Sequence, residues 1–175
     1  MSGTGQDQRY LQASAEYGEA LGRLARGYEA NTDRRRDLLQ EIHIALWRSF
    51  GRFDGRCSTR TWVYRVAHNV GASYVIRRRR EKTSALTGLD DLVAPSDTGN
   101  PERTTVDRQE FELLLAMIQT LKPADRQIVL LYLEDLDAAT IGEVTGLSPG
   151  AVATKIHRIK NILARRFEHG GRHDE

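Results

Sequence analysis

Apolar side chains recur three and four residues apart along most of the chain, which is the period of an amphipathic helix. In the first half this spacing predicts helices over roughly residues 13–28, 33–50 and 59–80. In the second half it predicts helices over roughly residues 111–121, 123–134, 137–145 and 149–168. Alternating apolar and polar runs, which are typical of strands, are missing. The pattern therefore predicts an all-α fold.

The helical pattern stops between residues 83 and 105, where glycine, proline and acidic residues replace most large apolar ones. Such a composition is typical of a flexible linker between two domains. We therefore expect five segments: a disordered N-terminal segment at 1–12, a small helical domain at 13–82, a linker at 83–107, a second helical domain at 108–168, and a tail at 169–175.

Residues 137–166 have the pattern of a helix-turn-helix. Gly146 suits the left-handed end of one helix, while Ser148 and Pro149 suit the cap and first position of the next. In the second helix, the outer face is predicted to hold Ala151, Thr154, Lys155 and Arg158. One such helix fits the DNA major groove, with Lys and Arg side chains on phosphates. The alternative is an ordinary solvated face, because Lys and Arg usually lie on the surface.

The first half combines aromatic, amide and basic side chains close together in the sequence: Arg56, Arg60, Trp62, Tyr64, Arg65, His68 and Asn69. Aromatic rings stack on unpaired bases, and arginines follow the phosphate backbone. This mixture predicts a site for single-stranded DNA. Trp62 also has the spacing of a core residue, which is the simpler interpretation of that residue alone.

Two groups of motifs carry a family resemblance. The first contains Asp37-Leu38-Leu39-Gln40-Glu41, Leu46-Trp47, Arg52-Phe53 and the run from Arg60 to Asn69. The second contains Leu121 to Leu133, Ile141 to Val144, Gly146-Leu147-Ser148 and Ile156-His157-Arg158. In this order they resemble region 2 and region 4 of the extracytoplasmic-function (ECF) sigma factors, a compact subfamily of the sigma-70 family. The resemblance covers the two predicted domains and leaves the linker between them.

The resemblance implies a non-enzymatic sigma factor that binds core RNA polymerase, recognises the −10 and −35 promoter elements and promotes DNA opening. A three- or four-helix bundle would dock on the polymerase through Asp37, Leu38, Gln40, Glu41 and Trp47. The same bundle would bind the melted −10 element through Arg56, Ser58, Arg60, Trp62, Arg65, His68 and Asn69. The helix-turn-helix would read the −35 duplex through Ser148, Ala151, Thr154, Lys155 and Arg158.

The partners implied by the family are promoter DNA and the clamp helices and flap of core polymerase. Many members are held inactive by an anti-sigma factor, which makes one a candidate partner here. No cofactor, metal or membrane insertion is expected, and no apolar run approaches the ~20 residues that span a bilayer. The single cysteine, Cys57, cannot form an internal disulfide and fits a reducing compartment. These features predict a cytoplasmic protein.

Two departures from the family pattern bear on the predicted surfaces. Arg34-Arg35-Arg36 stands where relatives usually carry acidic residues, which changes the charge of the edge predicted to face polymerase. Ala151 and Ala153 stand where the family commonly has threonine and a basic residue, so the −35 contact would depend more on DNA shape.

Two other classes of function stay open at this point. A free-standing helix-turn-helix regulator would find its operator unaided and usually as a dimer. A helical enzyme acting on nucleic acid would need a catalytic constellation. The candidates for such a constellation are two. Asp90-Asp91 is better interpreted as solvated charge in the linker. The tail could bind a metal weakly but is better interpreted as a set of unrelated terminal residues: His169, His173, Asp174 and Glu175.

Overall fold

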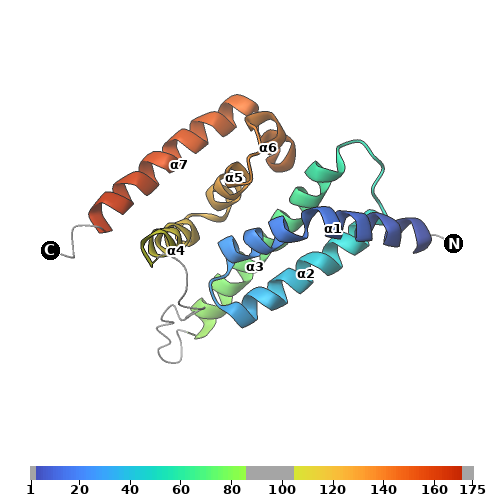
Figure 1. Ribbon diagram of the computed structural model, residues 1–175, viewed down its shortest axis with the longest axis horizontal. Helices are drawn as coiled ribbons and strands as arrows, with labels where there is room; N and C mark the ends of the chain where they lie inside the picture. The colour runs from blue at the N-terminus through green and yellow to red at the C-terminus, as the bar shows by residue number, and fades with distance from the viewer. Residues whose placement is uncertain (1–2, 86–104, 171–175) are drawn as a thin grey trace. The chain divides into compact units, whose positions relative to one another are not determined.

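The computed structural model of the chain describes residues 3–85 and 105–170 (Figure 1). These residues form seven helices and contain no strand, which confirms the predicted all-α class. The chain divides into two compact units, unit 1 at Met1–Ser96 and unit 2 at Asp97–Glu175. Most of the predicted linker and residues 171–175 of the predicted tail lie outside the described residues, as do Asp90, Asp91, His173, Asp174 and Glu175.

Unit 1 is a three-helix bundle of α1 (Gly3–Tyr28), α2 (Thr32–Phe50) and α3 (Thr59–Ala85), in which each helix packs on the other two. Its core is built from side chains at helical spacing, which include Leu21, Leu24, Leu38, Ile42, Leu46, Phe50, Val63 and Ala67. Helix α2 begins at Thr32, one residue before the predicted start at residue 33. Asn31 caps it, with Asn31 Oδ1 accepting a hydrogen bond from Arg34 N at 3.0 Å.

The predicted disorder of residues 1–12 is wrong for residues 3–12, which form the first turns of α1. Polar side chains of this segment find partners on α2. The Trp47 indole N–H donates to Asp7 Oδ1 at 2.7 Å, and Gln6 Nε2 donates to Trp47 O at 2.7 Å. Tyr10 Oη lies 3.1 Å from His43 Nδ1 and hydrogen-bonds with it. The segment is polar because it docks through hydrogen bonds rather than through an apolar face.

The Tyr28 ring of α1 packs against Gly71, a buried residue of α3. A Cβ atom at this position would lie only 2.6 Å from the ring of Tyr28. The absence of a side chain at Gly71 therefore lets the Tyr28 ring enter the core. Helix α3 then continues to Ala85, three residues into the predicted linker.

Unit 2 contains α4 (Thr105–Gln119), α5 (Pro123–Leu133), α6 (Ala138–Thr145) and α7 (Pro149–Gly170). Helix α4 begins within the predicted linker, and α7 continues two residues into the predicted tail. Pro123 occupies the start of α5, as the sequence predicts. The core is lined by Leu115, Ile118, Ile128, Leu131, Ile141, Val152 and Ile159. Within the described ranges, none of the helices has the length and apolar character needed to cross a membrane.

Candidate nucleic-acid and partner interfaces

The predicted helix-turn-helix is formed by α6 and α7. Gly146 has a φ of 78° and donates its N–H to Gly142 O at 2.8 Å, which ends α6 in the left-handed conformation that glycine favours. Gly142 is equally constrained, because a Cβ there would lie 2.6 Å from Leu147 O. Ser148 Oγ then accepts from Ala151 N at 3.2 Å and caps α7. The turn therefore matches the sequence prediction at Gly146 and Ser148.

The outer face of α7 differs from the prediction because its two cations, Lys155 and Arg158, both interact with a residue of another helix. Arg158 Nη2 donates to both carboxylate oxygens of Asp125 at 2.9 and 2.8 Å, and Lys155 Nζ lies 3.6 Å from Asp125 Oδ1. The Asp125 side chain, in the first turn of α5, is only 14% exposed. The two residues predicted to hold DNA therefore share a carboxylate that joins α7 to α5.

The polar residues that remain on the exposed N-terminal half of α7 are Thr154 and His157. Thr154 Oγ1 donates to Gly150 O at 3.0 Å, and His157 Nε2 lies 3.2 Å from Asn161 Nδ2. His157 is not among the residues predicted from the sequence, although it lies three residues after Thr154 and hence on the same face. Ala151 is half-buried, so it offers a smaller surface than predicted.

The loop between α2 and α3 presents the aromatic and basic groups of unit 1. Phe53 packs on Trp62 with ring centroids 5.1 Å apart, and the Arg9 guanidinium lies 5.9 Å from the Phe53 ring. Gly55 has a φ of 76°, and the Arg56 guanidinium lies 3.0 Å from the Asp54 carboxylate. The loop thus has a defined shape, and Phe53, which the sequence analysis left out of the site, is its central aromatic residue.

The residues predicted for the −10 element fall into three environments. Arg56, Arg60 and Asn69 are exposed, and Arg65 is half-buried. Trp62 is also half-buried, and its indole N–H donates to Ser49 Oγ at 2.9 Å. Ser58 Oγ accepts from Thr61 N at 3.0 Å, so this hydroxyl caps α3. The predicted site therefore keeps a surface that combines exposed arginines with the half-buried aromatic pair of Phe53 and Trp62.

His68 has to be removed from the predicted DNA contacts, because only 1% of it is exposed. Its Nδ1 lies 2.8 Å from Tyr28 Oη, with which it hydrogen-bonds, and burial lowers the pKa of His68 to about 3. The ring is therefore a neutral core residue that joins α3 to α1.

The α2 face predicted to bind a partner is largely exposed, with one correction. Leu38 is fully buried and belongs to the core of unit 1. Ile44, which is 44% exposed, continues the face instead. We define the α2 face as Asp37, Gln40, Glu41, Ile44 and Trp47. Glu41 accepts two hydrogen bonds from Arg77 Nη2 at 3.0 and 3.1 Å, so part of its charge is neutralised by α3.

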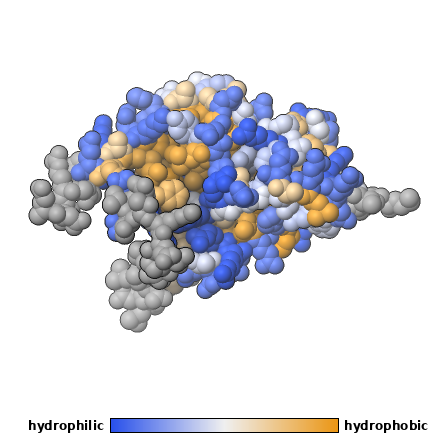
Figure 2. All heavy atoms as spheres, in the orientation of Figure 1, coloured by the Kyte–Doolittle hydropathy of each residue, from blue (hydrophilic) through white to orange (hydrophobic). Residues whose placement is uncertain are grey.

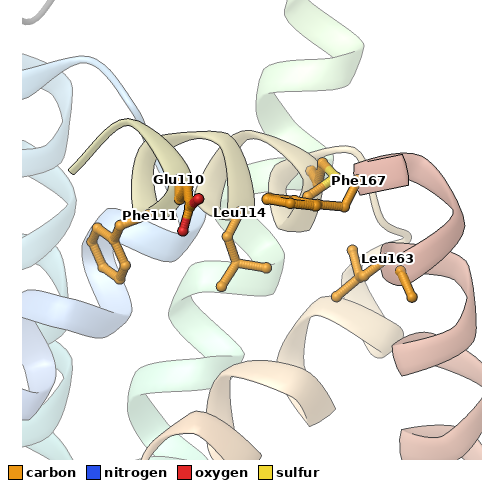
Figure 3. A pocket seen from close by; sticks show the side chains of 7 residues that line it. Glu110, Phe111, Leu114, Leu163 and Phe167 are labelled. Carbon is orange, nitrogen blue, oxygen red and sulfur yellow. The ribbon is translucent and has the colours of Figure 1, made fainter. Parts of the chain in front are cut away.

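Unit 2 has an apolar groove between α4 and α7, lined mainly by Phe111, Leu114, Met117, Leu163 and Phe167. Phe111 and Phe167 remain 47% and 40% exposed. Figure 2 shows apolar side chains gathered on this part of unit 2, and Figure 3 shows the labelled residues of both helices around the groove. An open groove of this composition is typical of a protein-binding surface.

Comparison with known proteins assigns both units to known families. Residues 15–81 match the family model "Sigma-70 region 2", and residues 111–163 match "Sigma-70, region 4". The ECF RNA polymerase sigma factor SigE of Mycolicibacterium smegmatis is 32% identical in an alignment of 154 residues that covers 85% of this chain and 57% of SigE. The RNA polymerase sigma factor NccH of Alcaligenes xylosoxydans xylosoxydans is 28% identical over 91% of this chain and 87% of NccH.

A solved structure with the same fold is the sigma factor RpoE of Bartonella quintana, in complex with the anti-sigma factor NepR. It aligns with a TM-score of 0.68 and 16% identity over 91% of this chain and 96% of RpoE. The likeness in fold therefore extends well beyond the likeness in sequence.

Proposed function

The chain belongs to the ECF group of the sigma-70 family of RNA polymerase sigma factors, and from this premise we propose that its two units hold two parts of one promoter. Sigma factors of this family serve in promoter recognition and transcription initiation. The observation that carries the proposal is the combination, in one chain, of an aromatic and basic loop in unit 1 with a helix-turn-helix in unit 2. The loop is suited to single-stranded DNA, and the helix-turn-helix is suited to duplex DNA.

Unit 1 would bind the −10 element as a single strand. Phe53 and Trp62 form a platform next to the loop, and Arg56 and Arg60 supply exposed positive charge beside it. Stacking of a base on an aromatic ring contributes roughly 1–3 kcal/mol, which is comparable with the cost of unstacking that base from the duplex. Capture of unpaired bases would therefore shift the promoter towards the open form without a catalytic step. On this basis we propose that the chain is not an enzyme.

Unit 2 would bind the −35 element as a duplex. The N-terminal half of α7 presents Thr154 and His157 at positions that face base edges in a helix-turn-helix. Ser148, which caps this helix, lies at an N-terminus that favours phosphate. Lys155 and Arg158 would reach phosphates while sharing Asp125, so their net contribution is smaller than that of two unneutralised cations. Readout would then depend partly on DNA shape.

The polymerase contacts would use the α2 face and the apolar groove. The α2 face combines exposed Ile44 and Trp47 with polar residues, which suits the clamp helices of the largest subunit. The groove between α4 and α7 suits an apolar segment of the flap. Because polymerase and promoter are found in the cytoplasm, we place the chain there as well.

An anti-sigma factor is a further proposed partner. RpoE of Bartonella quintana was solved with an anti-sigma factor, and CnrH was solved with the cytosolic domain of CnrY. The α2 face and the groove expose the apolar side chains that such a partner would cover. Its binding would compete with polymerase.

The test is in vitro transcription with the purified full chain and core polymerase on a library of genomic promoter fragments. We expect initiation at a restricted set of promoters that share −10 and −35 sequences, and none with either component alone. Tight binding of the chain to an operator without polymerase, together with no effect on initiation, would instead identify a free-standing regulator.

A further inference from the structure

Two runs of arginine come together at one end of unit 1. Arg34-Arg35-Arg36 lies in the first two turns of α2, and Arg77 to Arg80 lies near the end of α3. Figure 1 shows that α2 starts where α3 ends, at the opposite end of the bundle from the loop that carries Phe53. The Arg77 to Glu41 ion pair joins the two helices near this end.

The electrostatic surroundings of Tyr74 agree with this placement of the two runs. The Tyr74 hydroxyl donates to Glu29 Oε2 at the end of α1, and the Arg77 guanidinium lies 5.7 Å from the Tyr74 ring. Burial and the Glu29 carboxylate raise the pKa of Tyr74, whereas the positive charges of Arg78 and Arg34 lower it. One arginine from each run therefore acts on the same hydroxyl.

The charge at this end exceeds that of the whole protein. Residues 23–41 and 74–85, which we call the basic end, contain ten Lys and Arg against five Asp and Glu, a net charge of +5. The whole chain has a net charge of +2, so the remainder carries −3. Glu41 and Glu81 pair with Arg77 and Arg78, but Arg79 and Arg80 are also exposed. Concentration of positive charge on one surface is the usual footprint of a polyanion partner.

We propose that the basic end binds phosphates of the double-stranded DNA between the −10 and −35 elements. This inference rests on the proposed function of the two units. Arg60, beside the loop, and Arg79 are separated by 19 residues of one helix, or about 28 Å at about 1.5 Å per residue. That length corresponds to about eight base pairs at roughly 3.4 Å each.

The direction along the DNA follows from the proposed function. Unit 2 is proposed to hold the −35 element, which lies upstream of the −10 element proposed for the loop, and the DNA between the two elements is duplex. The far end of α3 would therefore meet duplex DNA upstream of the melted bases. Arginine suits this contact because its guanidinium binds phosphate oxygens in a bidentate geometry.

The test measures the affinity of the full chain with core polymerase for a promoter fragment as a function of salt. Arg79→Ala and Arg80→Ala, made singly, should each lower the salt slope by about 0.9 for one lost phosphate contact. The loss of affinity caused by each substitution should be about threefold greater at 50 mM salt than at 200 mM, because the contact contributes less at the higher concentration. Arg108→Ala removes an exposed charge from α4 and should leave the slope unchanged.

Neutral DNA provides the complementary test. Methylphosphonate linkages placed about eight base pairs upstream of the −10 element should weaken binding of the unchanged chain and have little further effect on Arg79→Ala. Equal slopes for all variants would overturn the inference. So would a loss of core polymerase affinity in the absence of DNA, which would point to an acidic polymerase surface. Failure of the unchanged chain to initiate transcription would refute the proposed function itself.

Discussion

At the scale of single residues, His68 shows how burial decides the role of a polar side chain. The same imidazole could bind DNA on the surface, but here it hydrogen-bonds with Tyr28 inside unit 1. Burial without a neighbouring carboxylate lowers its pKa to about 3. His68 therefore stays neutral in the folded protein at any pH near neutrality, and its protonation is coupled to unfolding.

Unit 1 should lose stability in acid because of this histidine. Above the unfolded pKa of about 6.5, both states are neutral at His68; below it, only the unfolded state takes up the proton. The free energy of unfolding should fall by about 2 kcal/mol between pH 8 and pH 5 from this group alone. Urea titrations followed by tryptophan fluorescence would measure it, because both tryptophans, Trp47 and Trp62, belong to unit 1.

His68→Gln isolates the effect, since glutamine is polar and does not titrate. Its pH dependence should be flatter than that of the unchanged chain by the same amount. His157→Gln, at an exposed histidine of unit 2, should leave the curve for unit 1 as it was. Parallel curves for His68→Gln and the unchanged chain would show that His68 can be protonated in the folded state.

Asp125 is a second residue whose role the sequence conceals. Its carboxylate ties α5 to α7 through Arg158 and Lys155, and it also lies in the first turn of α5, where negative charge is favourable. Asp125→Asn should lower the free energy of unfolding of unit 2 by about 1 kcal/mol, a value reduced by the exposure of Arg158. Hydrogen exchange of amides in α5 and α7 would measure the change.

Asp135→Asn is the matched control for this substitution. It removes the same charge from the same unit, at an exposed residue with a φ of 58°, which asparagine also adopts readily. We expect no change in exchange beyond a few tenths of a kcal/mol. Equal effects of the two substitutions would mean that the ion pairs of Asp125 add nothing to stability.

At the scale of helices, the packing of the Tyr28 ring of α1 against α3 depends on Gly71. An alanine there would meet the Tyr28 ring at 2.6 Å, and the ring is held in place by its hydrogen bond with His68. Overpacking of a core costs roughly 1–3 kcal/mol. Gly71→Ala should therefore lower the urea midpoint of unit 1 in tryptophan fluorescence, despite the better helix propensity of alanine.

Gly22→Ala separates propensity from packing. A Cβ at Gly22 meets nothing within 4 Å, so the substitution should raise the stability of α1 by roughly 0.5–1 kcal/mol. Opposite signs for the two glycines are the expected result. A stabilising Gly71→Ala would mean that Tyr28 can move aside at no cost.

The helices could be predicted from the sequence better than their faces could. Apolar spacing placed all seven, and the caps at Ser58, Gly146 and Ser148 follow local rules. The buried stripe of α3, however, runs through Tyr64, Ala67, His68 and Gly71, whereas Trp62, which has the spacing of a core residue, is only half-buried. A helix with apolar residues on more than one side is oriented by its neighbours, which the period alone does not specify.

At the scale of the whole molecule, the division into two helical units followed from composition, because a polar segment separates two patterned halves. The pairing of side chains across each unit could not be predicted from the composition or from the apolar pattern. Glu41 with Arg77 and Asp125 with Arg158 join residues more than thirty positions apart. Such pairs depend on tertiary packing. The residue types of the site could therefore be predicted from the sequence, but not which of them pair with other side chains of the protein.

Substitutions in unit 1 and in unit 2 should weaken different interactions of the protein. Gln40→Ala with Ile44→Ala changes the exposed α2 face, and Thr154→Ala changes the exposed face of α7. The first should weaken core polymerase binding about fivefold, equivalent to about 1 kcal/mol, and reduce transcription equally with an intact or a scrambled −35 element. The second should leave polymerase affinity unchanged.

The defect of Thr154→Ala should appear only where a −35 sequence is present to be read. With an intact element we expect an approximately fivefold loss of promoter occupancy, and with a scrambled element no further loss, because the lost contact is absent already. Fluorescence anisotropy with core polymerase and transcription from the paired promoters would measure the two effects. Identical defects in both variants would mean that the units act as one surface, since a change in either would then disturb both contacts.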